Sequence, residues 1–137
     1  MIMLYGSQQD YDVLAGRPGG GPVWSADDVA AMHAFMAEWN DDLVKSGEFV
    51  DAQGLTAPVH ARRIRLREGV PVVTDGPYAE TEEVLAGYTI VECDGFDRAT
   101  EIAARLARTP HPQGAALAHE WYVDVRPIAG SPAELEL

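Results

Sequence analysis

One short segment, residues 75–83 (Asp-Gly-Pro-Tyr-Ala-Glu-Thr-Glu-Glu), gathers carboxylates and an aromatic ring between two β-like runs of the chain. Its Gly-Pro pair cannot continue a regular strand or helix, since a residue before proline avoids the α region and proline has no N–H to donate. The chain must therefore leave a sheet at Asp75 and form an ordered loop. Such a loop can aim Asp75, Tyr78 and Glu80 into a shared space, where a desolvated carboxylate can act as a general acid or base.

The chemistry that this segment predicts is proton transfer without a metal, of the lyase or isomerase kind, on a small polar or aromatic molecule. Asp75 or Glu80 is expected to act as acid or base, with His33 or His111 as its partner. The candidate ligand-binding residues are Pro77, Tyr78, Arg63 and Arg65. Two structural alternatives stay open: a stiff turn in which Asp75 bonds to local backbone N–H groups, and a His33 that makes only a local contact beside the apolar stripe of a helix.

A row of arginines precedes this segment. Alternation along a strand places Arg63, Arg65 and Arg67 on one face, with Ile64 and Leu66 on the other. Charge rows of this kind usually pair with carboxylates on neighbouring strands. The functional alternative is an anion-binding patch.

Metal and cofactor chemistry is not expected. The four histidines (33, 60, 111 and 119) have no ligand spacing, and the glycine run 19–21 lacks the residues of a phosphate-binding loop. Cys93 is the single cysteine, so no intrachain disulfide can form, and a reducing, cytoplasmic location is expected. A buried structural thiol is the simplest interpretation of Cys93.

The composition of the chain indicates which kinds of partner it can bind. The chain has 137 residues and a formal charge of −12, with 10 basic and 22 acidic side chains, which disfavours binding to phosphate backbones. No apolar run approaches the roughly 20 residues that span a bilayer, and the first residues lack the pattern of a signal peptide. We therefore expect neither nucleic acid nor membrane as a partner, and the charge suits a protein partner with a basic surface.

The order of expected elements is β, α, several β, α, β. The elements are a strand 2–5, a flexible loop or lid 6–24, a helix from Ser25 to Gly47, a strand 48–55, a hairpin 61–67 and 70–74, a helical turn 81–85, a strand 87–93, a helix capped by Asp94, and a strand 119–128. The apolar stripes of the helices are Val29, Met32, Met36, Trp39 and Leu43, and then Ala99, Ile102, Ala103 and Leu106.

This order predicts an α+β fold, a ferredoxin-like sandwich with both helices on one face of the sheet. Aromatic Tyr88, Trp121 and Tyr122 on the strands indicate that a second subunit covers the other face, which gives a homodimer. Residues 1–128 are expected to form one domain and residues 129–137 a flexible acidic tail.

The nonapeptide at 75–83 closely resembles the Asp-Gly-Pro-Phe-Ala-Glu-Thr-Lys-Glu signature of DGPF-domain proteins, a branch of the YCII-related family. The likeness runs from Met3 to Ile128 and includes Val73-Thr74, Gly87-Tyr88 and the segment 123–128. It departs at Tyr78, where the signature has phenylalanine, and at Glu82, where the signature has lysine.

The resemblance implies a dimeric α+β barrel with a cleft near the subunit interface. Some relatives, among them a dehydrochlorinase of aromatic degradation, have a presumed catalytic His–Asp pair; Met36 stands at the matching histidine position, and the aspartate position falls in Thr109-Pro110-His111. The pair is therefore not reproduced in place. The genetic setting of DGPF proteins implies a possible partner, an extracytoplasmic-function sigma factor, so a non-catalytic dimer that binds a metabolite or a partner is the alternative to an enzyme.

Overall fold

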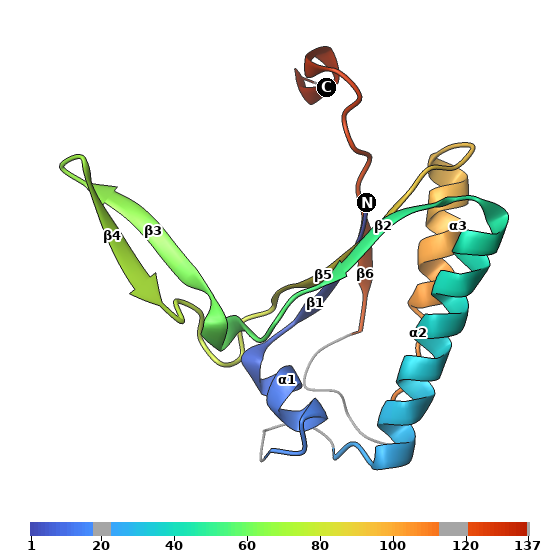
Figure 1. Ribbon diagram of the computed structural model, residues 1–137, viewed down its shortest axis with the longest axis horizontal. Coiled ribbons are helices and arrows are strands. Elements are labelled where there is room, and N and C mark those ends of the chain that lie inside the picture. The colour runs from blue at the N-terminus through green and yellow to red at the C-terminus, as the bar shows by residue number, and fades with distance from the viewer. Residues whose placement is uncertain (18–22, 113–120, 137) are drawn as a thin grey trace.

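The computed structural model describes residues 1–17, 23–112 and 121–136 of the chain (Figure 1). The elements are β1 (Ile2–Gly6), α1 (Gln8–Leu14), α2 (Ala26–Ser46), β2 (Phe49–Gly54), the 3-10 turn η1 (Pro58–His60), β3 (Arg62–Arg67), β4 (Val70–Asp75), β5 (Val84–Val91), α3 (Phe96–Leu106), β6 (Val123–Val125) and η2 (Pro132–Glu136). The expected alternation of strands and helices is confirmed.

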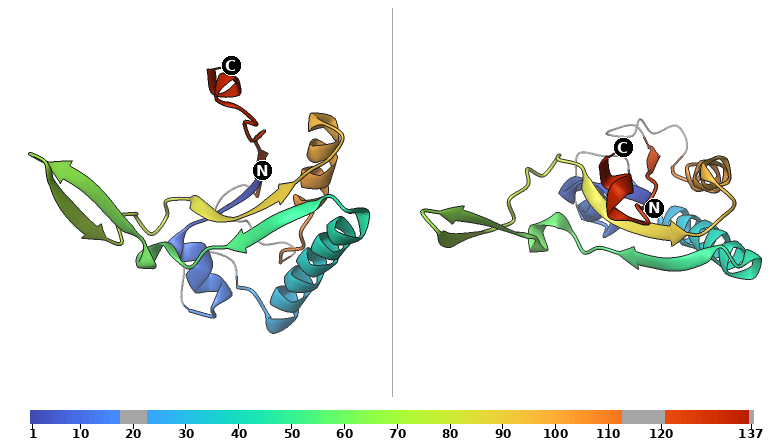
Figure 2. Two further views of the ribbon diagram at one scale, coloured as in Figure 1. Left: turned by 45° about the horizontal axis from the view of Figure 1, so that its top comes forward. Right: turned by 90° about the horizontal axis from the view of Figure 1, so that it is seen from above.

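Across these described ranges the strands form two sheets. The main sheet has the order β2-β5-β1-β6 with antiparallel neighbours, and β3 pairs with β4 in a separate hairpin. Since β2 lies beside β5 in this sheet and β1 lies between β5 and β6, the arrangement is an α+β fold compatible with the ferredoxin-like prediction. The hairpin extends away from the main sheet, and α2 and α3 lie at the other end of the molecule (Figures 1 and 2).

The core lies between one face of the main sheet and the helices α2 and α3. Its buried members are Ile2, Trp39, Leu43, Ile102, Ala103 and Leu106. The Nε1 of Trp39 donates a hydrogen bond of 3.0 Å to the carbonyl of Ile102, which ties α2 to α3. The apolar stripes that the sequence predicts for the two helices therefore supply most of the core, as period-3.6 patterning requires.

The predicted ends of α2 are confirmed. The Ser25 hydroxyl accepts from the backbone N–H of Asp28, and the Asp28 carboxylate accepts in return from the N–H of Ser25. This reciprocal capping box satisfies two backbone donors that a helix start leaves open. Gly47 ends the helix in the left-handed region at φ 80°, where a side chain would add strain.

The expectation of a flexible loop over residues 6–24 is wrong for its first part. Residues 8–14 form α1, because Ser7 and Asp10 make a second capping box of the same kind. The Tyr11 hydroxyl then donates to the carbonyl of Leu55 at 2.8 Å, which fixes this helix to the chain beyond β2. Residues 18–22 of the predicted loop lie outside the described ranges.

Three further expectations are corrected. Residues 81–85 form no helical turn, because a tight turn at Ala79–Glu82 leads directly into β5. Helix α3 starts after Gly95 without a side-chain cap, so Asp94 is not its N-cap. In the predicted strand 119–128 only Val123–Val125 pairs in the sheet, and residues 119 and 120 lie outside the described ranges.

A forked ion pair joins the start of β2 to α3. Arg98 donates from Nε and Nη2 to the two carboxylate oxygens of Glu48, each at 2.9 Å, and the Ser46 hydroxyl donates to the same carboxylate. These contacts, with Arg98 as the larger cause, lower the pKa of Glu48 from 4.5 to about 2. The charged form of Glu48 is therefore favoured by folding.

This ion pair predicts a pH dependence of stability. Because the folded chain holds the pKa of Glu48 below its ordinary value, the stabilisation is complete above pH 4.5 and declines as the pH falls toward about 2. Glu48→Gln should flatten the curve of unfolding free energy against pH in that window, as measured by urea titration at successive pH values. Glu101→Gln, which removes a more exposed partner of Arg98, is the matched control. An unchanged curve for Glu48→Gln would contradict the prediction.

Candidate functional site

The loop 75–83 is fixed mainly by backbone contacts. Gly76 has φ 53° and donates its N–H to the carbonyl of Ala61 at 2.8 Å, and the carbonyl of Glu80 accepts from the N–H of Gln9 at 3.0 Å. The first contact joins the loop to the base of the hairpin and the second joins it to α1. The predicted ordered excursion between two strands is therefore present.

The carboxylate of Asp75 faces an arginine. Its Oδ1 accepts from Nε of Arg62 at 2.9 Å, directly across the hairpin, and both side chains are more than two-thirds exposed. The hydrogen bond that the structure shows for Asp75 thus runs to a cation and not to the loop's own backbone. Such an exposed pair contributes at most about 1 kcal/mol of stability.

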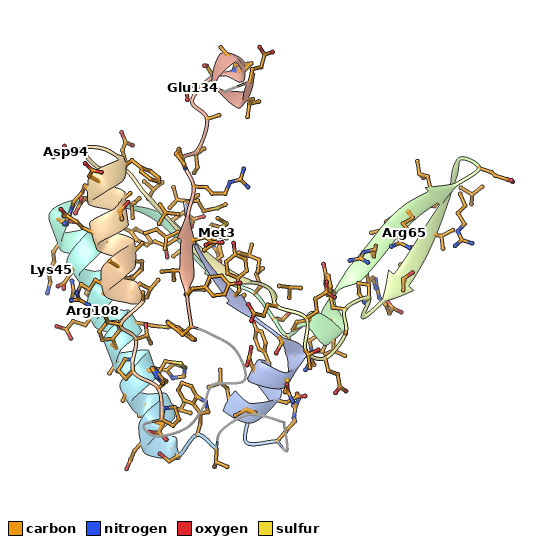
Figure 3. All side chains as sticks on the ribbon, turned by 180° about the vertical axis from the view of Figure 1, so that it is seen from behind. Met3, Lys45, Arg65, Asp94, Arg108 and Glu134 are labelled. Atoms are coloured by element: carbon orange, nitrogen blue, oxygen red, sulfur yellow. The ribbon has the colours of Figure 1, made fainter. Side chains whose placement is uncertain are left out.

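The aromatic residue of the loop also meets an arginine. The guanidinium carbon of Arg63 lies 5.1 Å from the ring centroid of the half-buried Tyr78, a cation–π arrangement. Pro77 beside it is half-buried. The predicted ligand-binding residues Arg63, Tyr78 and Pro77 therefore lie together at the base of the hairpin, whereas Arg65 lies farther out on β3 (Figure 3).

The candidate acids and bases come from separate parts of the fold. His33 is exposed on α2, and His111 follows α3, with its Nδ1 3.5 Å from the carbonyl of Thr109. Asp75 ends the hairpin strand β4, and the hairpin lies on the side of the main sheet away from α2 and α3 in Figures 1 and 2. Among the described residues no hydrogen bond or ion pair joins either histidine to Asp75 or to Glu80, and the catalytic roles stay predictions.

The face of the main sheet that carries no helix is rich in tyrosine. The rings of Tyr5 and Tyr122 stack with centroids 5.4 Å apart, and the Tyr122 hydroxyl donates to the Glu83 carboxylate at 2.8 Å. Glu83 raises the pKa of Tyr122 to about 12, while burial and then Asp124 raise the pKa of Tyr5. Both phenols therefore stay protonated at neutral pH and serve as hydrogen-bond donors.

A hollow of about 340 Å³ opens between α2 and the other face of the main sheet, and we call it the α2 hollow. Its lining is Ile2, Leu4, Met36, Trp39, Asn40, Ala52, Gln53, Gly54, Ala86, Gly87, Tyr88, Thr89 and Leu106. None of these is an Asp, Glu, His, Lys or Arg. The volume falls in the range of small-molecule sites, which are mostly apolar with a few polar groups.

Small residues on neighbouring strands create this space. Ala52 and Gly54 on β2 stand beside Ala86 and Gly87 on β5, so little side-chain volume fills the region under α2. A Cβ at Gly87 would come within 3.1 Å of the Gln53 carbonyl, so the strands are close enough there to favour glycine. Sequence analysis missed the hollow, although this cluster of small residues on two strands was a signal for it.

Two polar groups of the lining are available to a ligand. In the part of the chain that the structure describes, neither the Asn40 amide nor the Thr89 hydroxyl makes a side-chain hydrogen bond. An amide offers both donors and an acceptor, and a hydroxyl offers one donor and two acceptor positions. The α2 hollow can therefore hold an apolar body and bind one or two neutral polar groups on it.

Among the described residues no three His, Cys, Asp or Glu side chains come together in a way that could hold a metal ion. In the same ranges no helix has the length and apolar character that crossing a bilayer requires.

The fold places this chain in the α+β class, with a hollow beneath its longest helix, α2. The model of the YCII-related domain matches residues 1–116, so the chain belongs to the YCII-related family. It is also similar to Uncharacterized protein R00369 of Rhizobium meliloti (strain 1021), with 27% identity over 114 residues, which cover 82% of this chain and 86% of that protein. The predicted YCII-related family is thereby confirmed, and the DGPF branch stays a prediction.

Proposed function

We propose that this YCII-related protein is a homodimer that binds a neutral, mostly apolar small molecule in the α2 hollow. The observation that carries the proposal is the lining of the hollow, which combines apolar side chains with neutral polar groups. Proton transfer needs an acid or base within hydrogen-bond reach of the reacting atom. A lining without a carboxylate, imidazole, ammonium or guanidinium group favours binding over catalysis in this hollow.

The homodimer rests on the helix-free face of the main sheet. Tyr5 and Tyr122 stack there, and Tyr122 stays 41% exposed although an aromatic ring is costly to leave in water. A second copy packed on this face would bury the rings, while each tyrosine hydroxyl keeps a polar partner at the rim. This is the two-fold packing that the sequence predicts for a dimeric α+β barrel.

Two expectations remain predictions beside this proposal, one from the residues of the loop 75–83 and one from the DGPF resemblance. Acid–base catalysis by Asp75 and Glu80 needs partners that a single chain does not place beside them. A sigma factor as partner follows from the genetic setting of DGPF proteins alone. The ligand site proposed here requires neither of them.

The binding experiment uses the neutral apolar fluorophore N-phenyl-1-naphthylamine. Its emission should rise on titration with the protein and saturate, because a dry apolar site excludes water from the dye. Ala52→Phe places a ring in the hollow and should abolish the saturable rise. Val59→Phe, a change of similar size at an exposed site of η1, should leave it intact.

Two results would overturn the ligand proposal. One is a wild-type protein, folded by circular dichroism, that gives no saturable emission. The other is an Ala52→Phe protein with an unchanged melting temperature that binds the dye as the wild type does. Asn40→Leu provides a second test, because it removes the amide but keeps the shape of the side chain. It should lower the affinity for ligands that carry a carbonyl more than the affinity for hydrocarbons.

A further inference from the structure

The hairpin formed by β3 and β4, residues 62–75, extends from the protein as an arm (Figures 1 and 2). In the described chain its strands pair only with each other, in a sheet separate from the main one. A lone two-stranded hairpin is at best marginally stable in water and usually needs a surface to pack on. Within the described part of its own chain the arm therefore lacks a packing surface.

The two faces of the arm differ in chemistry. Strand register places Ile64, Val73 and Leu66 on one face, together with Pro71. Ile64 is 62%, Leu66 71% and Val73 57% exposed, so three large apolar side chains stand next to one another in water. A contiguous exposed apolar surface of this kind marks an interaction site.

The opposite face carries the arginine row. Arg63, Arg65 and Arg67 lie across from Thr74, Val72 and Val70. The expected pairing of this row with carboxylates of a neighbouring strand is therefore wrong, because the facing strand supplies a hydroxyl and two apolar residues there. Figure 3 shows Arg65 on the arm, away from the body of the protein. Since Arg63 lies over the Tyr78 ring, Arg65 and Arg67 are the members of the row that can meet a partner outside the chain.

The charge of the arm opposes that of the rest of the protein. Four of the ten basic residues of the chain lie in the arm, with only two of its 22 acidic residues, Glu68 and Asp75. The remainder of the chain is strongly acidic. A basic, apolar arm thus fits an acidic protein surface, and a second copy of this same chain presents one.

We propose that the arm packs against a second copy of this chain, with the apolar face of Ile64, Leu66 and Val73 buried there and the arginine row beside carboxylates of that copy. The inference rests on the homodimer of the proposed function and adds a second contact to it. It accounts together for the exposed apolar face, for Arg65 and Arg67, which have no ion-pair partner among the described residues, and for the missing packing surface. In the dimer each copy both provides an arm and receives one.

The experiment places the photo-crosslinking residue p-benzoylphenylalanine at position 66 and mixes unlabelled with ¹⁵N-labelled protein. Illumination should give a crosslinked dimer of hybrid mass, with the crosslink between position 66 and a peptide of the other copy. The same residue at position 38, on the exposed side of α2, is the control and should give no such product. Sedimentation equilibrium on the same samples reports whether the protein is dimeric.

Charge reversal tests the arginine row. Arg65→Glu with Arg67→Glu should weaken dimerisation roughly tenfold or more, because two attractive contacts become repulsive. The matched control reverses Lys45 and Arg108, two exposed basic residues of the body (Figure 3), with the same change in net charge. The control should weaken dimerisation much less.

The outcomes separate the arm from the dimer. A dimeric protein whose position 66 forms no crosslink to the other copy overturns the arm contact and leaves the homodimer standing. A monomeric protein overturns both, and the dye titration then decides the ligand site alone. A control pair that weakens dimerisation as much as the arm pair shows a general charge effect and overturns the role of the row.

Discussion

Replacing Trp39 with alanine is expected to lower the free energy of unfolding by about 3–5 kcal/mol, the usual cost of deleting a buried aromatic side chain. Trp39 is only 4% exposed and stands in the core between α2 and α3. The change removes both the packing of the indole and its hydrogen bond to the Ile102 carbonyl. Urea denaturation followed by circular dichroism gives the value, since tryptophan fluorescence itself changes in this variant.

Trp39→Phe separates the two contributions. It keeps an aromatic ring in the core but has no N–H, so it should lose about 1 kcal/mol for the hydrogen bond together with a smaller packing term. A loss for Trp39→Ala below about 1 kcal/mol would contradict the assignment of this residue to the core.

Replacing Ile2 with alanine should cost about 2–5 kcal/mol. Ile2 is 1% exposed and lies in β1 between Thr89 of β5 and Val125 of β6, so its side chain is covered by both neighbouring strands and by the helices. Because Ile2 also lines the α2 hollow, its truncation enlarges an existing space. The same denaturation assay measures the loss.

Two matched variants serve as controls for Ile2→Ala. Ile2→Val removes one methylene and should cost about 0.5–1.5 kcal/mol. Val50→Ala, at a site of β2 that is 53% exposed, should change stability by no more than about 0.5 kcal/mol. An Ile2→Ala protein as stable as Val50→Ala would show that β1 does not anchor the core.

The parts of the fold that could be predicted are those that a local pattern specifies. The stripe from Met32 to Leu43 repeats every three or four residues, and Ser25 and Gly47 bracket it, so α2 was accessible from sequence alone. The hairpin was accessible because alternation on both sides meets at Glu68-Gly69, where both residues adopt positive φ. Each of these signals is contained in neighbouring residues.

The errors come from contacts that no neighbouring residues reveal. Helix α1 is too short to show a period, and it is held by the capping box of Ser7 and by the reach of Tyr11 to Leu55, a residue far along the chain. Long-range contacts of this kind decide local structure where propensity is weak. The error on the arginine row had another cause: the two-residue turn at Glu68-Gly69 pairs Arg67 with Val70 and so fixes the facing residues, and the expectation of carboxylates overlooked this register.

The candidate site likewise has one part that the sequence predicts and one part that it does not. The loop 75–83 was located because its residue types are unusual. The contact of Asp75 with Arg62 follows from strand pairing, whereas Tyr78 meets Arg63 from the loop beyond β4. The α2 hollow could not be found by searching for reactive groups, because an absence of side-chain volume defines it. Met36 and Trp39 belonged to a core stripe in the sequence, and only the small residues opposite them show that the core is incomplete there.

The alternation of β1 has a consequence for any ligand of this protein. Ile2 and Leu4 point toward the α2 hollow, whereas Met3 and Tyr5 belong to the opposite face of the same strand. The same strand thus borders the α2 hollow on one side and the helix-free face on the other, so a shift in its backbone moves residues on both sides. Thermodynamic linkage then couples the proposed ligand to the proposed dimer. If a ligand in the α2 hollow changes the dimerisation constant by some factor, dimerisation changes the affinity for that ligand by the same factor.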